Sequence, residues 1–202
     1  AQGTRFQAIR IEIQDKKQLS SANSINISRL LPQSIYYSWA WICAGRPKDL
    51  LVSVPSGNFG NLTGGLIAKK MGLPITRFLA SVNANDVFPK YLKSGKYEPK
   101  PSLQTLSNAM DVGNPSNFAR IKNLYGEDKI KIEEDILSLS VDNNSTVEEI
   151  IYTKNEFNYL PDPHTAVGIH GLKQFLKEDQ GGIVLSTAHP GKFTDIIEPI
   201  IN

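Results

Sequence analysis

A short loop rich in glycine and asparagine, residues 56–61, has the composition of a small phosphate-binding site. It follows the apolar run of residues 50–54 and precedes a helix-compatible segment, so its context is strand, turn and helix. In that context, backbone N–H groups at the helix N-terminus bind an anion. No lysine follows the last glycine as in a nucleotide-binding P-loop, and no acidic residue is placed to bind a ribose. The loop predicts a pocket for one phosphate monoester, and a plain strand–helix turn is the alternative.

Two further polar loops follow predicted buried strands. Residues 187–191 come after the apolar run 183–186, and residues 83–86 follow the strand expected at 76–82. Ligands in open α/β sheets bind at the carboxyl ends of strands, so we expect the three loops to share a small-molecule site. Thr187 could instead cap the last helix, and His189 fits a packed or capping role better than a catalytic one.

A serine- and asparagine-rich stretch near the N-terminus leads into an arginine. Asn26 and Arg29 are three residues apart and share one face if the segment is helical. Arg29 could bind a second anion, although a solvent-exposed helix face explains the same spacing.

Strands and helices alternate along the chain, which predicts an α/β fold with a parallel-type sheet flanked by helices. The long segment 94–110 between them is expected to be functional, and the helix at 146–157 would begin with a capping box of Thr146 and Glu149. The predicted strands are residues 5–13, 50–54, 76–82 and 183–186; the predicted helices are 27–41, 61–71, 86–92, one starting at 114–116, 129–139, 146–157, 164–177 and one from 193.

Composition narrows the class of protein. The chain has 202 residues and a formal charge of +2, and its scattered basic residues give no sign of nucleic-acid binding. No apolar run is long enough to cross a membrane and residues 1–17 lack a signal-peptide core, so no membrane partner is expected. The single Cys43 excludes an internal disulfide, is expected to be buried, and indicates a reducing, cytoplasmic setting. No metal-ligand spacing appears, and His164 and His170 fit structural roles.

Five segments in order along the chain together resemble the threonine synthase family, pyridoxal-phosphate (PLP) enzymes of fold type II. The resemblance covers residues 19–202 and implies the C-terminal part of a PLP-dependent catalytic domain, with an incomplete tryptophan synthase β-like architecture. Residues 1–18 match poorly, and we interpret them as a replaced start or an artificial boundary. The matching segments are residues 20–33, 54–61, 83–86, 106–117 and 186–193.

The resemblance implies conversion of O-phospho-L-homoserine and water to L-threonine and phosphate. Thr187 would place its hydroxyl near the pyridine nitrogen of PLP, and Lys192 is a further candidate for anion contact. The family's pattern assigns the cofactor phosphate to Gly57, Asn58, Phe59, Gly60 and Asn61, and the substrate to Asn23, Ser24, Asn26 and Arg29.

The family's Schiff-base lysine lies in a Phe-Lys-Asp segment, followed by Ser-Gly-Asp-Thr-Gly, and neither occurs in this sequence. We therefore expect the chain alone to be inactive, since covalent catalysis needs that lysine. The parent enzyme would be a monomer, and an exposed sheet edge would make this chain self-associate. Two alternatives remain open: a related phospho-lyase or amino-acid synthase of this fold, and a non-catalytic phosphate-binding module.

Overall fold

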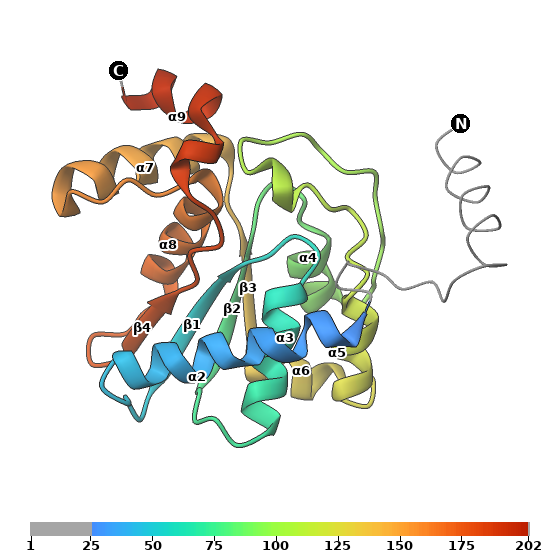
Figure 1. Cartoon of the computed structure of the whole chain (residues 1–202). Helices are drawn as coiled ribbons and strands as arrows, with labels where there is room; N and C mark the ends of the chain where they lie inside the picture. Colours follow the sequence, from blue (N-terminus) through green and yellow to red (C-terminus); the bar gives the residue numbers. More distant parts are fainter. Residues whose placement is uncertain (1–25, 202) are drawn as a thin grey trace, which may run out of the picture.

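The computed structural model describes residues 26–201, and the predicted strand at residues 5–13 lies outside them. A four-stranded sheet forms the centre of the molecule, with the order β3-β2-β1-β4 and every neighbouring pair parallel. The expected α/β class is confirmed (Figure 1). The strands are β1 (Leu50–Pro55), β2 (Arg77–Val82), β3 (Ile136–Ser140) and β4 (Gly181–Val184).

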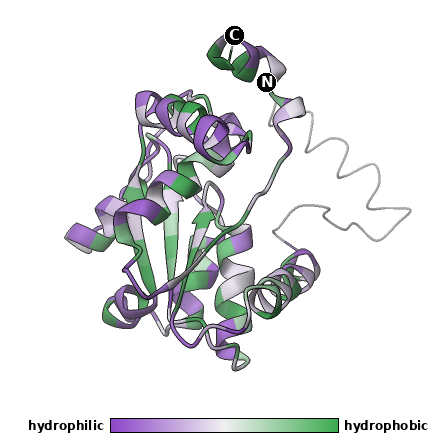
Figure 2. Cartoon of the chain, turned by 90° about the vertical axis from the view of Figure 1, so that its left-hand side faces the viewer, coloured by the Kyte–Doolittle hydropathy of each residue, from purple (hydrophilic) through white to green (hydrophobic). Residues whose placement is uncertain are grey.

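Helices cover both faces of the sheet, so the strands lie between two helical layers (Figure 2). The core on one face receives side chains from α2 (Ser34–Cys43), α3 (Gly60–Lys70), α4 (Val87–Ser94), α5 (Phe118–Leu124) and α6 (Lys129–Asp135). The other face is covered by α8 (Pro163–Phe175), with α7 (Asn143–Phe157) and α9 (Thr194–Ile201) outside it. Short 3-10 turns complete the fold: η1 (Ile27–Arg29), η2 (Leu31–Gln33), η3 (Asn108–Met110) and η4 (Pro190–Lys192).

Helix α8 lies unusually close to the sheet because glycine occurs where it crosses the strands. A Cβ atom on Gly168 would lie 2.8 Å from Val184 and 2.9 Å from Pro55, so a side chain there would collide. The same close approach lets Ser53 Oγ donate to the carbonyl of Gly168 at 2.7 Å. Every residue of β1 is buried, which explains why this strand appears in the sequence as a continuous apolar run.

The predicted helix at residues 129–139 is wrong in its second half. Helix α6 ends at Asp135, and residues 136–140 form the edge strand β3. The charged helix runs directly into Ile-Leu-Ser-Leu-Ser, whose apolar residues also fit a helical pattern. Pairing with β2 decides the outcome, because Phe78 aligns with Ile136 and Ser138 Oγ donates to the carbonyl of Ala80 at 2.7 Å.

Smaller corrections concern a helix start, the N-terminal helix and the cysteine. Helix α7 begins at Asn143 because the Asp142 side chain accepts from the Ser145 N–H at 2.8 Å, so the predicted Thr146–Glu149 capping box is wrong. The helix expected at 27–41 consists of two 3-10 turns followed by α2. Cys43 is exposed at the end of α2, because the apolar residues beside it also face outward.

Candidate functional site

The strand order creates a crevice between the carboxyl ends of β1 and β4. These strands are neighbours, but β1 leads into α3 on one face of the sheet and β4 leads toward α9 on the other. Loops that leave adjacent parallel strands in opposite directions leave a cleft between them, which is the usual ligand position in open α/β sheets. The glycine-rich loop and the Thr187 loop are the two sides of this cleft.

The glycine-rich loop enters α3 through a left-handed residue. Phe59 has φ of +59° and its ring is buried against Phe88, with the ring centroids 4.8 Å apart. A non-glycine residue held in this conformation costs about 1 kcal/mol or more, which the packing of its ring offsets. The backbone N–H groups of Gly60, Asn61 and Leu62 donate no hydrogen bond to any described residue. The first turn of α3 contains no acidic residue, so it offers free donors and a positive dipole end.

These N–H groups border a cavity of about 260 Å³. Gly57 lines this cavity and lies tightly against Met110, since a Cβ there would lie 2.7 Å from the Cα of Met110. The structure thus brings Thr187, after β4, to the same cavity as the loop after β1. The lining residues are Gln33, Pro55, Ser56, Gly57, Asn58, Phe59, Gly60, Asn61, Leu62, Ala109, Met110, His164 and Thr187.

A larger cavity of about 750 Å³ adjoins the first and shares Gln33, Asn61 and Thr187 with it. Arg29 lines this second cavity, so the structure places it in the same crevice as the glycine-rich loop. Gln33 lines both cavities, and its buried side-chain oxygen accepts no hydrogen bond from a described residue. Sequence reasoning did not single out Gln33.

The four other expected substrate residues line neither cavity or lie outside the described residues. Asn26 caps η1, where its side chain accepts from the Ser28 N–H at 3.1 Å, and it lines neither cavity. Lys192 is exposed in η4 and also lines neither cavity. Asn23 and Ser24 lie outside the described residues. His189 accepts from the Gly191 N–H at 3.1 Å, which confirms its capping role.

The loop after β2 supports the site without lining either of the two cavities. Asn83 Nδ2 donates to Thr105 Oγ1 and to Asp111 Oδ1, both at 2.8 Å. Asn85 Nδ2 reaches the same Asp111 oxygen at 3.2 Å. These buried amides hold the segment of residues 103–111, whose Ala109 and Met110 do line the smaller cavity. The expectation that this loop joins the others in the site is therefore corrected: its polar residues act through a second segment.

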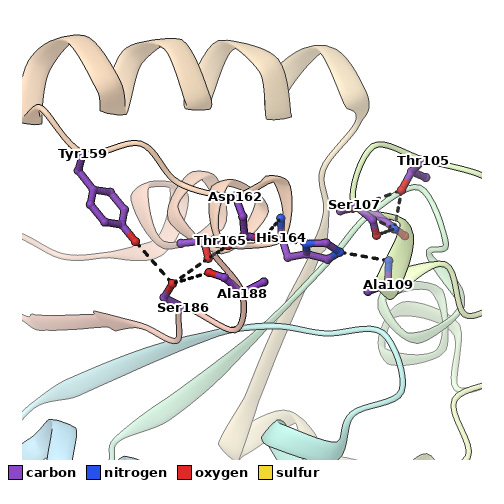
Figure 3. A network of polar contacts seen from close by, with 10 residues as sticks. Thr105, Ser107, Ala109, Tyr159, Asp162, His164, Thr165, Ser186 and Ala188 are labelled. Atoms are coloured by element: carbon purple, nitrogen blue, oxygen red, sulfur yellow. Dashed lines mark hydrogen bonds and ion pairs between the residues drawn. The ribbon is translucent and has the colours of Figure 1, made fainter. Parts of the chain in front are cut away.

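Asp162 and His164 form a buried hydrogen-bonded pair beside the smaller cavity, and Figure 3 shows their contacts. His164 Nδ1 lies 2.7 Å from Asp162 Oδ1, and its Nε2 accepts from the Ala109 N–H at 3.1 Å. Burial raises the pKa of Asp162, but hydrogen bonds from His164 and Thr165 lower it by a larger amount, so the pKa lies below its ordinary value. His164 is 3% exposed and lines the cavity, a position that its sequence context did not reveal.

The described residues contain neither a candidate metal site nor a membrane-spanning helix. No group of three or more His, Cys, Asp or Glu side chains in residues 26–201 is arranged to hold a metal ion. Within the same residues, no helix combines the length and apolar character needed to cross a membrane.

Several curated threonine synthases are similar to this chain, although no protein-family model matches it. The threonine synthase of Haemophilus influenzae is 48% identical over 198 residues, covering 95% of this chain and 45% of that protein. The Escherichia coli threonine synthase is 43% identical over 187 residues, covering 91% of this chain and 43% of that protein. The chain thus spans less than half the length of these curated relatives.

Solved structures agree with the sequence comparison. The crystal structure of E. coli threonine synthase matches with a TM-score of 0.84 at 44% identity, over 91% of this chain and 43% of that chain. A PLP-bound threonine synthase from Brucella melitensis matches with a TM-score of 0.89 at 30% identity, over 98% of this chain and 48% of that chain. A threonine deaminase at 18% identity, with a TM-score of 0.58, shares the fold alone. The chain is therefore a homologue of the threonine synthases, corresponding to somewhat less than half of such an enzyme.

Proposed function

We propose that this chain forms the part of a threonine synthase that binds the phosphate of PLP and one side of the substrate. The observation that carries the proposal is the row of unpaired N–H groups at the start of α3, which borders a cavity at the carboxyl end of β1. A phosphate dianion there gains charge-assisted hydrogen bonds and the favourable end of the helix dipole. A side chain at Gly57 would collide with the backbone of Met110, so only glycine lets the loop and this turn line the cavity in their present positions.

The residues present suit this cofactor. Gly57, Asn58, Phe59, Gly60 and Asn61 would hold its phosphate, and Thr187 would meet the pyridine nitrogen with a neutral hydroxyl. When bound, PLP supplies an electron sink for carbanion chemistry on amino acids. A hydroxyl partner leaves the ring nitrogen largely unprotonated, so Thr187 moderates the strength of that sink.

The larger cavity is the proposed place of the substrate. Arg29 supplies a guanidinium for a second phosphate group, as O-phospho-L-homoserine would require. Asn23, Ser24, Asn26 and Lys192 remain proposed substrate contacts on the family resemblance alone. The reaction proposed for the whole enzyme converts O-phospho-L-homoserine and water to L-threonine and phosphate.

No lysine among the described residues lines either cavity. Lys69 and Lys70 lie at the opposite end of α3, and Lys69 pairs with Asp135 at 2.6 Å. We therefore expect the chain by itself to bind PLP without a covalent bond and to form no threonine.

The test is a binding titration that separates the phosphate from the ring. The 202-residue chain is titrated with PLP and with pyridoxal, which lacks the phosphate, while ligand fluorescence and absorbance are followed. We expect PLP to bind at least tenfold more tightly than pyridoxal and inorganic phosphate to compete with it. Equal affinity for the two ligands would contradict the proposed phosphate cradle.

A second measurement addresses covalent attachment. The chain is incubated with PLP, reduced with borohydride and analysed by mass spectrometry, with threonine formation from O-phospho-L-homoserine measured in parallel. Scattered, substoichiometric labelling without threonine formation is expected. Stoichiometric labelling of a single lysine together with threonine formation would refute the expected inactivity.

A further inference from the structure

Asp162 makes more hydrogen bonds than its place at the start of α8 requires. Its carboxylate accepts from the backbone N–H groups of His164 at 2.9 Å and Thr165 at 3.4 Å, which is ordinary helix capping. It also accepts from the side chains of both residues, and the residue as a whole is 1% exposed. Serine or asparagine could cap the helix, but two side-chain donors require the second oxygen and the charge of a carboxylate.

The first of these donors leads to the phosphate end of the site. His164 Nε2 accepts the N–H of Ala109, so the ring proton must lie on Nδ1 and point to Asp162. Ala109 belongs to η3, and the next residue, Met110, lies against the backbone of Gly57. Asp162 therefore fixes the His164 tautomer that anchors this turn over the glycine-rich loop.

The second donor leads to the opposite wall. The Thr165 hydroxyl donates its single proton to Asp162 Oδ2, because the carboxylate can only accept. The same hydroxyl oxygen lies 3.2 Å from Ser186 Oγ, within hydrogen-bond distance. Ser186 directly precedes Thr187, and both residues line the larger cavity. This second chain of contacts fixes the segment that carries Thr187.

We infer that Asp162 is a positioning residue for both walls of the site, acting through His164 on the phosphate side and through Thr165 on the Thr187 side (Figure 3). The inference rests on the proposed function only for the identity of the ligand. Losing either arm removes one hydrogen bond from the buried Asp162 carboxylate and loosens one wall, while the other wall keeps its support.

Matched pairs of variants separate the two arms. In His164→Gln the side-chain oxygen can still accept from Ala109, whereas the shorter side chain of His164→Asn cannot reach it. In Thr165→Ser the hydroxyl remains, whereas Thr165→Val removes it and keeps the shape. Amide hydrogen exchange of the 202-residue chain, followed by mass spectrometry, reports residues 105–111 and 185–189 separately. PLP affinity is measured on the same samples.

We expect His164→Asn to speed exchange in residues 105–111 about tenfold, the equivalent of ~1.4 kcal/mol for one lost hydrogen bond. His164→Gln should be intermediate, because it keeps the contact with Ala109 and loses the one with Asp162. Thr165→Val should do the same in residues 185–189, with Thr165→Ser close to the parent. Both damaging variants should weaken PLP binding several-fold. Exchange that rises equally in β1, β2 and both segments would overturn the inference, because Asp162 would then only stabilise the fold. A parent chain that binds no PLP would refute the proposed function alone, since the exchange results need no ligand.

Discussion

A methyl group added to Gly57 would test how tightly the glycine-rich loop packs against the backbone of Met110. The Cβ of Gly57→Ala would lie 2.7 Å from the Cα of Met110 and 3.2 Å from its carbonyl carbon and oxygen. Ordinary contact begins at 3.4 Å, so the nearest pair must separate by about 0.7 Å. All three neighbours are backbone atoms of a turn that His164 and the Asn83 amide hold in place, so the turn cannot retreat cheaply.

Two effects of this substitution oppose each other. Overpacking of a well-ordered contact costs about 1–3 kcal/mol. Replacing glycine with alanine also restricts the unfolded chain, which stabilises the folded state by about 0.4–1 kcal/mol. The steric cost is the larger because backbone must move, so we expect a net loss of about 1–2 kcal/mol in the free energy of unfolding. Moving the loop also displaces its N–H donors, so PLP affinity should fall at least tenfold.

The assay is urea denaturation of the 202-residue chain, followed by circular dichroism, together with a PLP titration. Gly182→Ala in β4 is the matched control, because its Cβ would meet only the flexible ends of Leu172 and Leu176 at 3.0 Å. We expect that variant to retain PLP affinity and most of its stability. If Gly57→Ala keeps both the stability and the affinity of the parent, the reasoning about this close approach is wrong.

Three further predictions concern other parts of the molecule. Arg29→Ala should weaken the binding of inorganic phosphate to the PLP-saturated chain about three- to tenfold, with Arg29→Lys intermediate. The effect is modest because solvent screens the attraction between an exposed guanidinium and the phosphate. Equal phosphate affinities for the parent and both variants in isothermal titration calorimetry would contradict a role in anion binding. The hydrogen bonds to Asp162 lower its pKa despite burial. The carboxylate therefore stabilises the folded state fully above about pH 4, and this stabilisation is lost as the pH falls through the lower folded-state pKa. In urea denaturation between pH 2 and 6, the free energy of unfolding of Asp162→Asn should depend less on pH than that of the parent, and an identical pH dependence would contradict this. Ile35 and Trp39 are 65% and 67% exposed on α2, so we expect the chain to self-associate through these side chains. The double variant Ile35→Gln/Trp39→Lys should self-associate less, and equal sedimentation of parent and variant would contradict a role for this surface.

The sequence identified the strands and helices whose burial leaves a simple pattern. Strand β1 is buried on both faces and α3 follows it directly, so an apolar run and a glycine-rich turn were sufficient to predict them. Strand β3 escaped prediction because it is short, follows a charged helix and depends on pairing with β2, a contact between residues about 58 positions apart. Pairing over such a distance has no local signature.

The site was predicted where backbone and glycine define it and missed where long-range contacts do. Residues 57–61 could be identified from a local pattern, and the structure places them around one cavity. The hydrogen bond between His164 and Ala109 joins residues 55 positions apart, so only the fold reveals that His164 borders this cavity. Asn83 shows the converse problem, since a buried asparagine that supports a loop has the same residue type and position as one that binds a ligand.

The residues that line the smaller cavity are more buried than those that line the larger one, so we expect the smaller cavity to bind its phosphate more strongly. Around the smaller cavity, Phe59, Leu62, Met110 and His164 are each less than 5% exposed, so charge there interacts through a low effective dielectric. Around the larger cavity, most lining residues are exposed, Arg29 among them, and solvent screens its charge. A phosphate at the start of α3 therefore gains more free energy per hydrogen bond than a phosphate at Arg29. Of the two anions proposed for this crevice, the cofactor should be the one that this chain holds by itself, with the substrate phosphate bound weakly until the solvent around Arg29 is excluded.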